Sequence, residues 1–282
     1  MSPDRIICPI CGSEESRLEK TVRSHEVWRC LGCDLYWVPR LAGWSAEVFY
    51  DQDYFQGEEV ERGYSNYPDN EHDHRLNARQ ILRLLGRHAK GKGRLLDVGC
   101  AYGFLPHEAG LAGWDAEGVE PSRAAQQYAV EKLGVKVTQG SMVGAKFPSA
   151  SFDAITCIGT IEHLADPMEV VREAARVIKP GGLFVLTTMD TMRLMPFRIK
   201  PPEHLYYFSR NNLAQLLEAH GFVVEQHKAY YAYRSIMEFF GLVVYVLIGD
   251  RRINPEPFLR LFRRVGSCKL PTNEMIMVAR KA

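Results

Sequence analysis

Two carboxylates and a turn of small residues are spaced as a nucleoside-binding site requires. Residues 97–103 read Asp-Val-Gly-Cys-Ala-Tyr-Gly, after the apolar stretch 94–96 and before a segment compatible with a helix. Gly99 and Gly103 lack a Cβ atom, so the backbone can bend sharply there and approach a ligand closely. Asp97 stands at the carboxyl end of a predicted strand, where open α/β sheets bind ligands. Glu120 ends the next predicted strand, where a carboxylate can bind both hydroxyls of a ribose.

Four cysteines near the start of the chain have the spacing of a zinc ribbon. Cys8 and Cys11 form one Cys-x2-Cys pair, and Cys30 and Cys33 form a second pair eighteen residues later. Two such pairs can place four thiolates at the corners of a tetrahedron, and a segment of about forty residues buries too little surface to fold alone. The alternatives to a zinc site are two disulfides or four free thiols that bind no metal. Other cysteines at predicted core positions and the lack of a signal-peptide pattern favour a reducing compartment, and therefore structural zinc.

Further motifs follow in a fixed order. Residues 152–158 predict a strand, Glu162-His-Leu-Ala-Asp-Pro the loop after it, and Lys179-Pro-Gly-Gly a turn before the strand 183–187. With the 97–103 turn and Glu120, they closely resemble the class I S-adenosylmethionine-dependent methyltransferases, over roughly residues 91–224 and the final strand. The resemblance implies an α/β fold with a Rossmann-like, doubly wound, seven-stranded mixed sheet. Ala101 replaces the middle glycine of the first motif, which tightens the turn without excluding the cofactor.

The resemblance also implies the residues that bind S-adenosylmethionine. They lie after four successive strands: Asp97, Gly99, Cys100, Ala101, Gly103, Glu120, Pro121, Ser141, Met142 and Ile158. Ser141 and Met142 are expected beside the adenine, although the acidic residue usual in the family is missing there. A nicotinamide-binding domain is the nearest alternative for the glycine turn alone. Its Gly-x-Gly-x-x-Gly pattern has two residues before the third glycine, because a pyrophosphate must rest on the helix N-terminus.

Two histidines are candidates for the base. Methyl transfer from a sulfonium is an in-line displacement, so the enzyme must hold the acceptor in line and remove its proton. His163 follows the fourth strand, and His204 follows the fifth, in a segment similar to the substrate-side loop of small-molecule and sugar methyltransferases. His204 is slightly preferred, with Glu203 as its orienting carboxylate. The alternative roles are structural: His163 holds backbone, or His204 braces the tyrosine loop that follows it.

The acceptor is predicted only by class. O-methylation of a small molecule, sugar or glycan precursor is preferred. The four-cysteine start also resembles deoxysugar C-methyltransferases, but these carry a further large C-terminal domain that is lacking here. A ribosomal RNA base methyltransferase with a zinc finger is the main alternative, yet the formal charge is only +1 and residues 159–162 lack the Asn/Asp-Pro-Pro motif of base-amine enzymes. A non-enzymatic scaffold is disfavoured by the intact turn and Glu120.

The predicted domain organisation has three parts. Residues 1–44 form the zinc ribbon, residues 45–90 an aromatic lid or linker with a helix at 75–88, and residues 91–282 the methyltransferase domain. The aromatic rings before residue 70 either cover the sulfonium or fasten the ribbon to the larger domain. The ribbon is expected to be a separate module whose loss leaves the larger core intact.

A helical insert is predicted at residues 230–271. Its apolar stretch 239–248 is too short to span a bilayer, which needs about 20 residues, and the following stretch is basic. One alternative is that the insert covers a sheet edge or forms a dimer contact. The other is that it rests on a membrane through residues 236–264, where it would reach a lipid-linked glycan acceptor. We expect a cytoplasmic protein, with peripheral membrane association as the alternative. The oligomeric state cannot be predicted.

Overall fold

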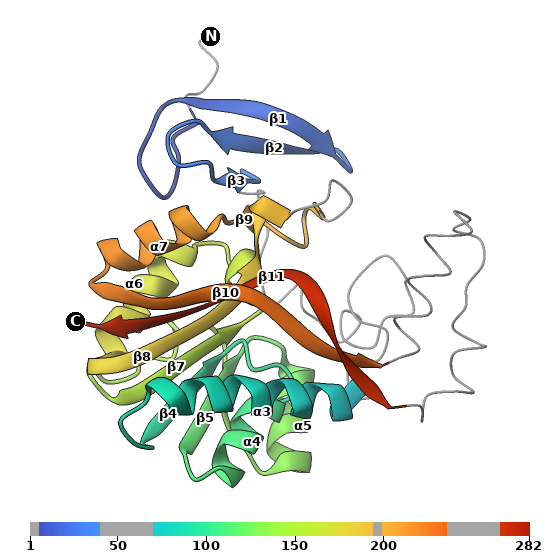
Figure 1. Ribbon diagram of the computed structural model, residues 1–282, viewed down its shortest axis with the longest axis vertical. Helices are drawn as coiled ribbons and strands as arrows, with labels where there is room; N and C mark the ends of the chain where they lie inside the picture. The colour runs from blue at the N-terminus through green and yellow to red at the C-terminus, as the bar shows by residue number, and fades with distance from the viewer. Residues whose placement is uncertain (1–5, 40–69, 194–198, 236–265) are drawn as a thin grey trace.

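The computed structural model describes residues 6–39, 70–193, 199–235 and 266–282, which form two sheets (Figure 1). The larger sheet has seven strands in the order β10-β11-β8-β7-β4-β5-β6. These strands are β4 (Arg94–Val98), β5 (Asp115–Glu120), β6 (Lys136–Gln139), β7 (Phe152–Ile158), β8 (Ile178–Met189), β10 (Phe222–Ser235) and β11 (Ser267–Lys281). The five strands β4 to β8 run parallel to one another, and β11 is antiparallel to both of its neighbours, β8 and β10. The predicted seven-stranded mixed sheet is confirmed.

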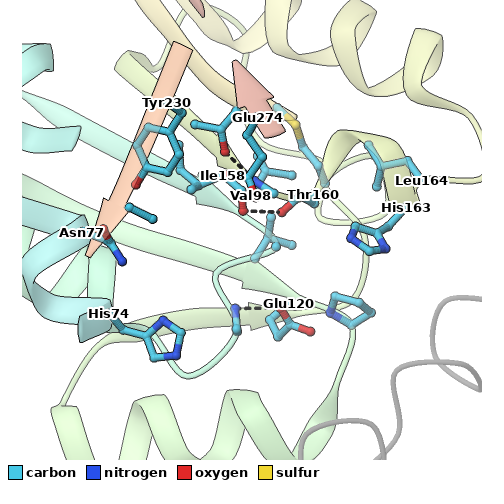
Figure 2. A pocket seen from close by; sticks show the side chains of 18 of the residues that line it. His74, Asn77, Val98, Glu120, Ile158, Thr160, His163, Leu164, Tyr230 and Glu274 are labelled. Atoms are coloured by element: carbon cyan, nitrogen blue, oxygen red, sulfur yellow. Dashed lines mark hydrogen bonds between the residues drawn. The ribbon is translucent and has the colours of Figure 1, made fainter. Parts of the chain in front are cut away.

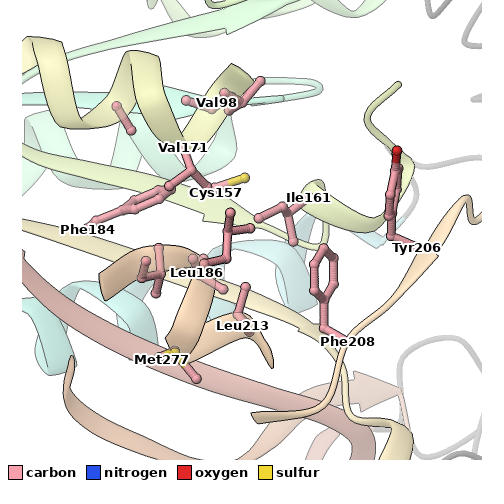
Figure 3. Packing of buried hydrophobic residues seen from close by; sticks show 14 of the residues in the cluster. Val98, Cys157, Ile161, Val171, Phe184, Leu186, Tyr206, Phe208, Leu213 and Met277 are labelled. Atoms are coloured by element: carbon pink, nitrogen blue, oxygen red, sulfur yellow. The ribbon is translucent and has the colours of Figure 1, made fainter. Parts of the chain in front are cut away.

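Helices cover both faces of this sheet. They are α3 (Glu71–His88), α4 (Phe104–Leu111), α5 (Arg123–Leu133), α6 (Pro167–Val177) and α7 (Arg210–Ala219). Successive residues of a strand point to opposite faces, so Leu95 of β4 packs in the cluster with α3 and α4, while Leu96 packs in the cluster with α6 and α7. Figure 3 shows the second cluster, in which Val171, Leu186 and Leu213 meet. Among the described residues, no helix is long and apolar enough to cross a membrane.

The helix starts follow the sequence signals. The side chain of Asp166 accepts a 2.9 Å hydrogen bond from the N–H of Glu169, with Pro167 at the first helical position of α6. Ser209 caps α7 in a reciprocal capping box with Asn212. The 3₁₀ turn η2 (Ile161–His163) follows β7 where the sequence predicts a loop, and this turn fixes the position of His163. A second 3₁₀ turn, η3 (Thr191–Arg193), follows β8.

The C-terminal strands are longer than predicted. β10 and β11 pair as far as Ser235 and Ser267, beyond the end of the β11–β8 pairing at Glu274. The predicted helical insert is therefore wrong for residues 230–235 and 267–271, which are strand; residues 236–265, and with them the membrane-contact segment 236–264, lie outside the described residues. The amide of Asn77 on α3 accepts from the N–H of Tyr233 (2.7 Å) and donates to its carbonyl (3.0 Å), so α3 supports this extension.

The cysteine-rich segment forms a small sheet of β1 (Ser16–Val22), β2 (His25–Cys30) and β3 (Tyr36–Trp37). Its fourth strand is β9 (Tyr206–Tyr207), which comes from the larger domain and pairs antiparallel with β3. In Figure 1 the blue ribbon strands lie directly against this segment. The ribbon and the larger domain thus share a sheet and one continuous apolar cluster, while the expectation that the larger core survives loss of the ribbon stays a prediction. The aromatic segment before residue 70 lies outside the described residues.

Candidate functional site

A cavity of about 330 Å³ opens at the carboxyl ends of the parallel strands. Figure 2 shows its wall, with Glu120 at one end and Tyr230 and Asn77 at the other. Most of the residues predicted to bind the cofactor line it: Gly99, Ala101, Glu120, Pro121, Ser141, Met142 and Ile158. Asp97, Cys100 and Gly103 are not part of the lining. This volume is within the range of small-molecule sites in proteins.

The turn after β4 has the backbone conformation that its glycines predict. Gly99 has φ +68°, and a Cβ atom there would lie 2.6 Å from the Thr160 side chain. A Cβ atom on Gly103, at φ +77°, would lie 2.7 Å from the Cβ of Ala129. Ala101, between them, has φ 46°, a left-handed conformation that costs a residue with a Cβ about 1–2 kcal/mol. Ala101 therefore adopts the geometry of the missing glycine at an energetic cost.

Glu120 is 3% exposed at the end of β5. Its carboxylate accepts one hydrogen bond from the N–H of Ala101 (2.8 Å) and one from the N–H of Ser122 (2.9 Å). Burial raises the pKa of Glu120 to about 7. Each carboxylate oxygen has two lone pairs, so one acceptor position on each remains for a ligand hydroxyl.

Asp97 lies behind the turn instead of in the cavity wall. Its Oδ1 accepts a hydrogen bond from the hydroxyl of Thr156 on β7, at 2.6 Å. Burial raises its pKa to about 7, and the nearby Glu120 carboxylate contributes to that rise. The geometry suits a residue that holds the β4 and β7 strand ends together beneath the turn.

The two candidate histidines lie together, but only His163 lines the cavity. The rings of His163 and His204 meet edge to face, with centroids 4.6 Å apart. Nδ1 of His163 lies 2.7 Å from the carbonyl oxygen of Glu203. A carbonyl can only accept, so Nδ1 carries the proton and Nε2 carries the lone pair. Burial lowers the pKa of His163 to about 4, which keeps the ring neutral. Glu203 thus orients His163 through its backbone, whereas the sequence suggested a carboxylate acting on His204.

The far end of the cavity is built by residues that the sequence did not single out. They come from α3, β8 and the β10–β11 extension: Asp73, His74, Asn77, Thr187, Tyr230, Arg234 and Glu274. Burial lowers the pKa of His74 to about 4, with Arg234 adding to the effect, and its ring stacks on Phe104. Burial raises the pKa of Tyr230, so its phenol stays protonated. Tyr230 and Arg234 lie in a stretch whose composition predicts a helical insert, so the sequence carries no signal of their place in the cavity.

The four ribbon cysteines are close enough to share one ion. Their sulfur atoms all lie within 4.8 Å of one another. The Cys8–Cys33 sulfurs are 3.6 Å apart and the Cys11–Cys30 sulfurs 3.5 Å apart, far beyond the 2.05 Å of a disulfide. Four sulfurs held tetrahedrally at about 2.3 Å from zinc would be separated by about 3.8 Å. The donor set and spacing therefore fit a structural zinc ion.

Comparison with known proteins places this architecture in one family. The family model described as "Methyltransferase domain" matches residues 70–227, more than half of the chain. The ubiquinone biosynthesis O-methyltransferase of Alkalilimnicola ehrlichii is 34% identical over 105 residues, which cover 34% of this chain and 42% of that protein. The chain spans about half the length of the curated relatives it matches.

Solved structures share the fold at low identity. Geranyl diphosphate methyltransferase, solved with GPP and sinefungin, is 18% identical with a TM-score of 0.53, and the match covers 73% of this chain and 78% of that one. An S-adenosylmethionine-dependent methyltransferase from Methanosarcina mazei is 16% identical with a TM-score of 0.50, and the match covers 70% and 96% of the two chains. The chain therefore belongs to the methyltransferase domain family, and its fold is that of the class I S-adenosylmethionine-dependent methyltransferases.

Proposed function

We propose that this protein transfers the methyl group of S-adenosylmethionine to a hydroxyl group of a small molecule. The observation that carries the proposal is one cavity that contains both the Glu120 end, suited to a ribose, and a neutral histidine with its lone pair on Nε2. The description of the curated relatives as O-methyltransferases supports the choice of a hydroxyl acceptor.

The cofactor is assigned to the end of the cavity at β4 and β5. Glu120 accepts hydrogen bonds from the two ribose hydroxyls, and the backbone at Gly99 and Ala101 lies against the amino acid part. Ser141 and Met142 border the adenine, with Met142 supplying a buried apolar surface. S-adenosylmethionine, when bound, supplies an electrophilic methyl group on a sulfonium.

His163 is the proposed base. The acceptor hydroxyl donates a hydrogen bond to Nε2, which keeps an oxygen lone pair directed at the methyl carbon. As the new C–O bond forms and the bond from the methyl carbon to the sulfonium sulfur breaks, the electron pair would stay on sulfur as a neutral thioether. The hydroxyl becomes strongly acidic, so even a histidine whose pKa is about 4 can take the proton. The proton passes to Nε2, and Nδ1 keeps its bond to the carbonyl of Glu203. His204 supports the ring of His163 and is assigned no direct contact with the acceptor.

Paired substitutions at the two histidines test these roles. With an acceptor identified from a screen of phenols, nucleotide-sugars and glycolipids, we expect His163→Gln to lower kcat by about 10²–10⁴-fold. The dissociation constant for S-adenosylmethionine should stay within about twofold of that of the wild type. His204→Gln is the matched control, with a smaller loss. Equal losses in both variants, or an unchanged kcat in His163→Gln, would refute the assignment.

Other acceptors remain narrower proposals. A sugar is one such acceptor. A lipid-linked glycan would be reached through membrane contact of residues 236–264, and co-sedimentation with anionic and neutral vesicles at low salt tests that contact; protein left in the supernatant with both kinds of vesicle would exclude it. An RNA acceptor is disfavoured by the formal charge of +1, and binding to RNA should fall steeply with salt if it occurs. C-methylation of a sugar would give a product stable to ether cleavage, which mass spectrometry distinguishes.

The ribbon is proposed to hold one structural zinc ion. Cys8, Cys11, Cys30 and Cys33 would supply four thiolates and leave no open coordination position. The ion would stabilise the ribbon and take no direct part in methyl transfer, because the sulfur cluster is not part of the cavity lining.

A further inference from the structure

The ribbon is joined to the domain that carries the histidines by backbone hydrogen bonds. Tyr36 pairs with Tyr207 across β3 and β9, and the N–H of Val38 donates to the carbonyl of Leu205 at 2.8 Å. In the segment just before β3, the side-chain amide of Asn212, at the start of α7, donates to the carbonyl of Cys33 at 3.2 Å. A ligand cysteine is therefore one hydrogen bond away from the larger domain.

Tyr207 fixes the loop that precedes β9. Its side chain is fully buried at 0% exposure. The hydroxyl accepts from the N–H of Lys200 (3.0 Å) and donates to the carbonyl of His204 (3.2 Å). The N–H of His204 in turn donates to the carbonyl of Lys200 at 2.9 Å. The phenol of Tyr207 thus bonds to both ends of the 200–204 turn, which the backbone bond also closes.

This turn holds His163 through two bonds. The carbonyl of Glu203 accepts from Nδ1 of His163, at 2.7 Å. The N–H of Leu205 donates to the carbonyl of Glu162, at 2.9 Å, so the backbone beside His163 is also tied to the turn. Figure 3 shows Ile161 and Phe208, which flank these contacts, packed beside each other in the apolar cluster. The histidine is held from one side by a segment that the ribbon strand supports.

We propose that the four-cysteine ribbon is a positioning part of the active site, acting through Tyr207, a positioning residue that sets the tautomer and orientation of His163. The proposal rests on the assignment of His163 as the base in the proposed function. The order of contacts is β3, then β9, then the 200–204 turn, then Nδ1 of His163. The ribbon keeps the lone pair on Nε2, because Nδ1 must stay protonated while the Glu203 carbonyl is in place.

The consequence is a dependence of catalysis on metal that involves no contact between metal and substrate. If the ribbon loosens, β9 loses its partner strand and the turn loses its support from Val38. His163 is then free to adopt the other tautomer, whose Nε2–H cannot accept the proton of the acceptor. Cofactor binding at Glu120 is made by a different part of the sheet and is expected to persist.

Tyr207→Phe tests the positioning role, with Tyr231→Phe as the matched control because Tyr231 is 43% exposed and does not line the cavity. We expect Tyr207→Phe to lower kcat about tenfold, with KM and the dissociation constant for S-adenosylmethionine within about twofold. Nitrogen-15 spectra of labelled histidine, assigned with His163→Gln, should show Nδ1 of His163 protonated in the wild type and in Tyr231→Phe. In Tyr207→Phe they should show a mixture of tautomers. A single unchanged tautomer in Tyr207→Phe would overturn the proposal.

Zinc removal tests the role of the ribbon. The wild-type protein is treated with a chelator, and hydrogen exchange is followed residue by residue. The amides of Val38 and Leu205 should exchange at least tenfold faster, while those of β4 and β5 keep their protection and S-adenosylmethionine still binds. Unchanged protection of Leu205, once metal analysis shows the zinc to be gone, would refute the coupling. If the whole chain unfolds on chelation, the ribbon is essential to global stability. The tautomer of His163 in Tyr207→Phe then decides between the proposal and its refutation.

These readouts separate the proposal from the proposed function. The tautomer and the exchange rates are measured without an acceptor, so they hold or fail independently of methyl transfer. The tautomer mixture in Tyr207→Phe could appear as expected while His163→Gln keeps full activity. That combination would support the structural link from the ribbon to His163 but would refute His163 as the base.

Discussion

The carboxylate of Glu120, at the end of β5, accepts a 2.8 Å hydrogen bond from the backbone N–H of Ala101 in the turn after β4. The carboxylate proposed to bind the ribose therefore also holds the turn that is proposed to lie against the amino acid part of the cofactor. A second bond, from the N–H of Ser122, fixes the other oxygen. Loss of this carboxylate is expected to affect two parts of the cofactor site together.

We expect Glu120→Gln to weaken S-adenosylmethionine binding by about 1–3 kcal/mol. The glutamine keeps the size of the side chain, but hydrogen bonds to a charged group contribute about 1.5–3 kcal/mol and those to a neutral group about 0.5–1.5. Titration calorimetry measures the effect, and Asp115→Asn, at the exposed start of the same strand, is the control. Equal affinity in wild type and Glu120→Gln would argue against the assigned cofactor orientation.

S-adenosylmethionine affinity should increase as pH rises toward 8. Burial raises the pKa of Glu120 to about 7 in the free protein, and the ionised form is the stronger acceptor for ribose hydroxyls. Below that pKa, binding must release a proton, so each pH unit weakens binding by up to about tenfold. Calorimetry in buffers of different ionisation enthalpy measures the proton release. Glu120→Gln should give a flatter profile, and a slope unchanged by this substitution would assign the titration to another group.

The stability of the cofactor-free protein should show the opposite trend. Between pH 4.5 and about 7 the folded protein retains a proton on Glu120 that the unfolded chain has lost. The folded state then binds more protons than the unfolded state, so the contribution of Glu120 to stability falls as pH rises through this window. Urea denaturation of wild type and Glu120→Gln at several pH values isolates this contribution. A difference between the two proteins that does not vary with pH would contradict it.

Ala101→Gly should stabilise the protein by up to about 1.5 kcal/mol. The alanine has φ 46°, which costs about 1–2 kcal/mol, and the glycine gives back about 0.4–1 through the greater freedom of the unfolded chain. Ala124→Gly, within α5, should instead destabilise by about 1 kcal/mol. The midpoints of urea unfolding compare the two. Destabilisation by both substitutions would mean that the methyl group of Ala101 makes contacts that outweigh the strain.

The purified protein should contain about one zinc ion per chain. Cys30→Ser should lose most of it, because a structural tetrahedral site needs all four thiolates. Cys268→Ser, on β11 and away from the cluster, should retain it. Metal analysis by mass spectrometry after extensive dialysis gives the stoichiometry. A full complement of zinc in Cys30→Ser would rule out the four-thiolate site.

Local signals were sufficient to predict the sheet and the turn and carboxylate that line one end of the cavity. The turn at Gly99, the acid at Glu120 and the cap at Asp166 each act within a few residues of their own position, so their types and spacing carry the information. The steric reason for Gly99 is visible only in the structure, where Thr160, distant in sequence, occupies the space of a Cβ atom.

Long-range pairing could not be predicted from local patterns. β3 and β9 have two residues each, too few for a periodic signal, and their pairing joins Tyr36 to Tyr207. Which of His163 and His204 lines the cavity could not be predicted for the same reason, because it depends on how the 3₁₀ turn after β7 meets the turn before β9. Tyr230 was missed because the apolar residues after it suggested helices, whereas β10 continues past it.

The position of β11 in the sheet has a consequence for synthesis of the chain. β11 pairs with β8 on one side and with β10 on the other, although it follows both in sequence. A ribosome that adds about 5–20 residues per second therefore exposes the buried edge of β8 for some seconds before its partner emerges. During that interval the nascent chain presents an apolar strand edge that can pair with another molecule. We therefore expect chaperones that bind unpaired strands to contact this protein before β11 has been made.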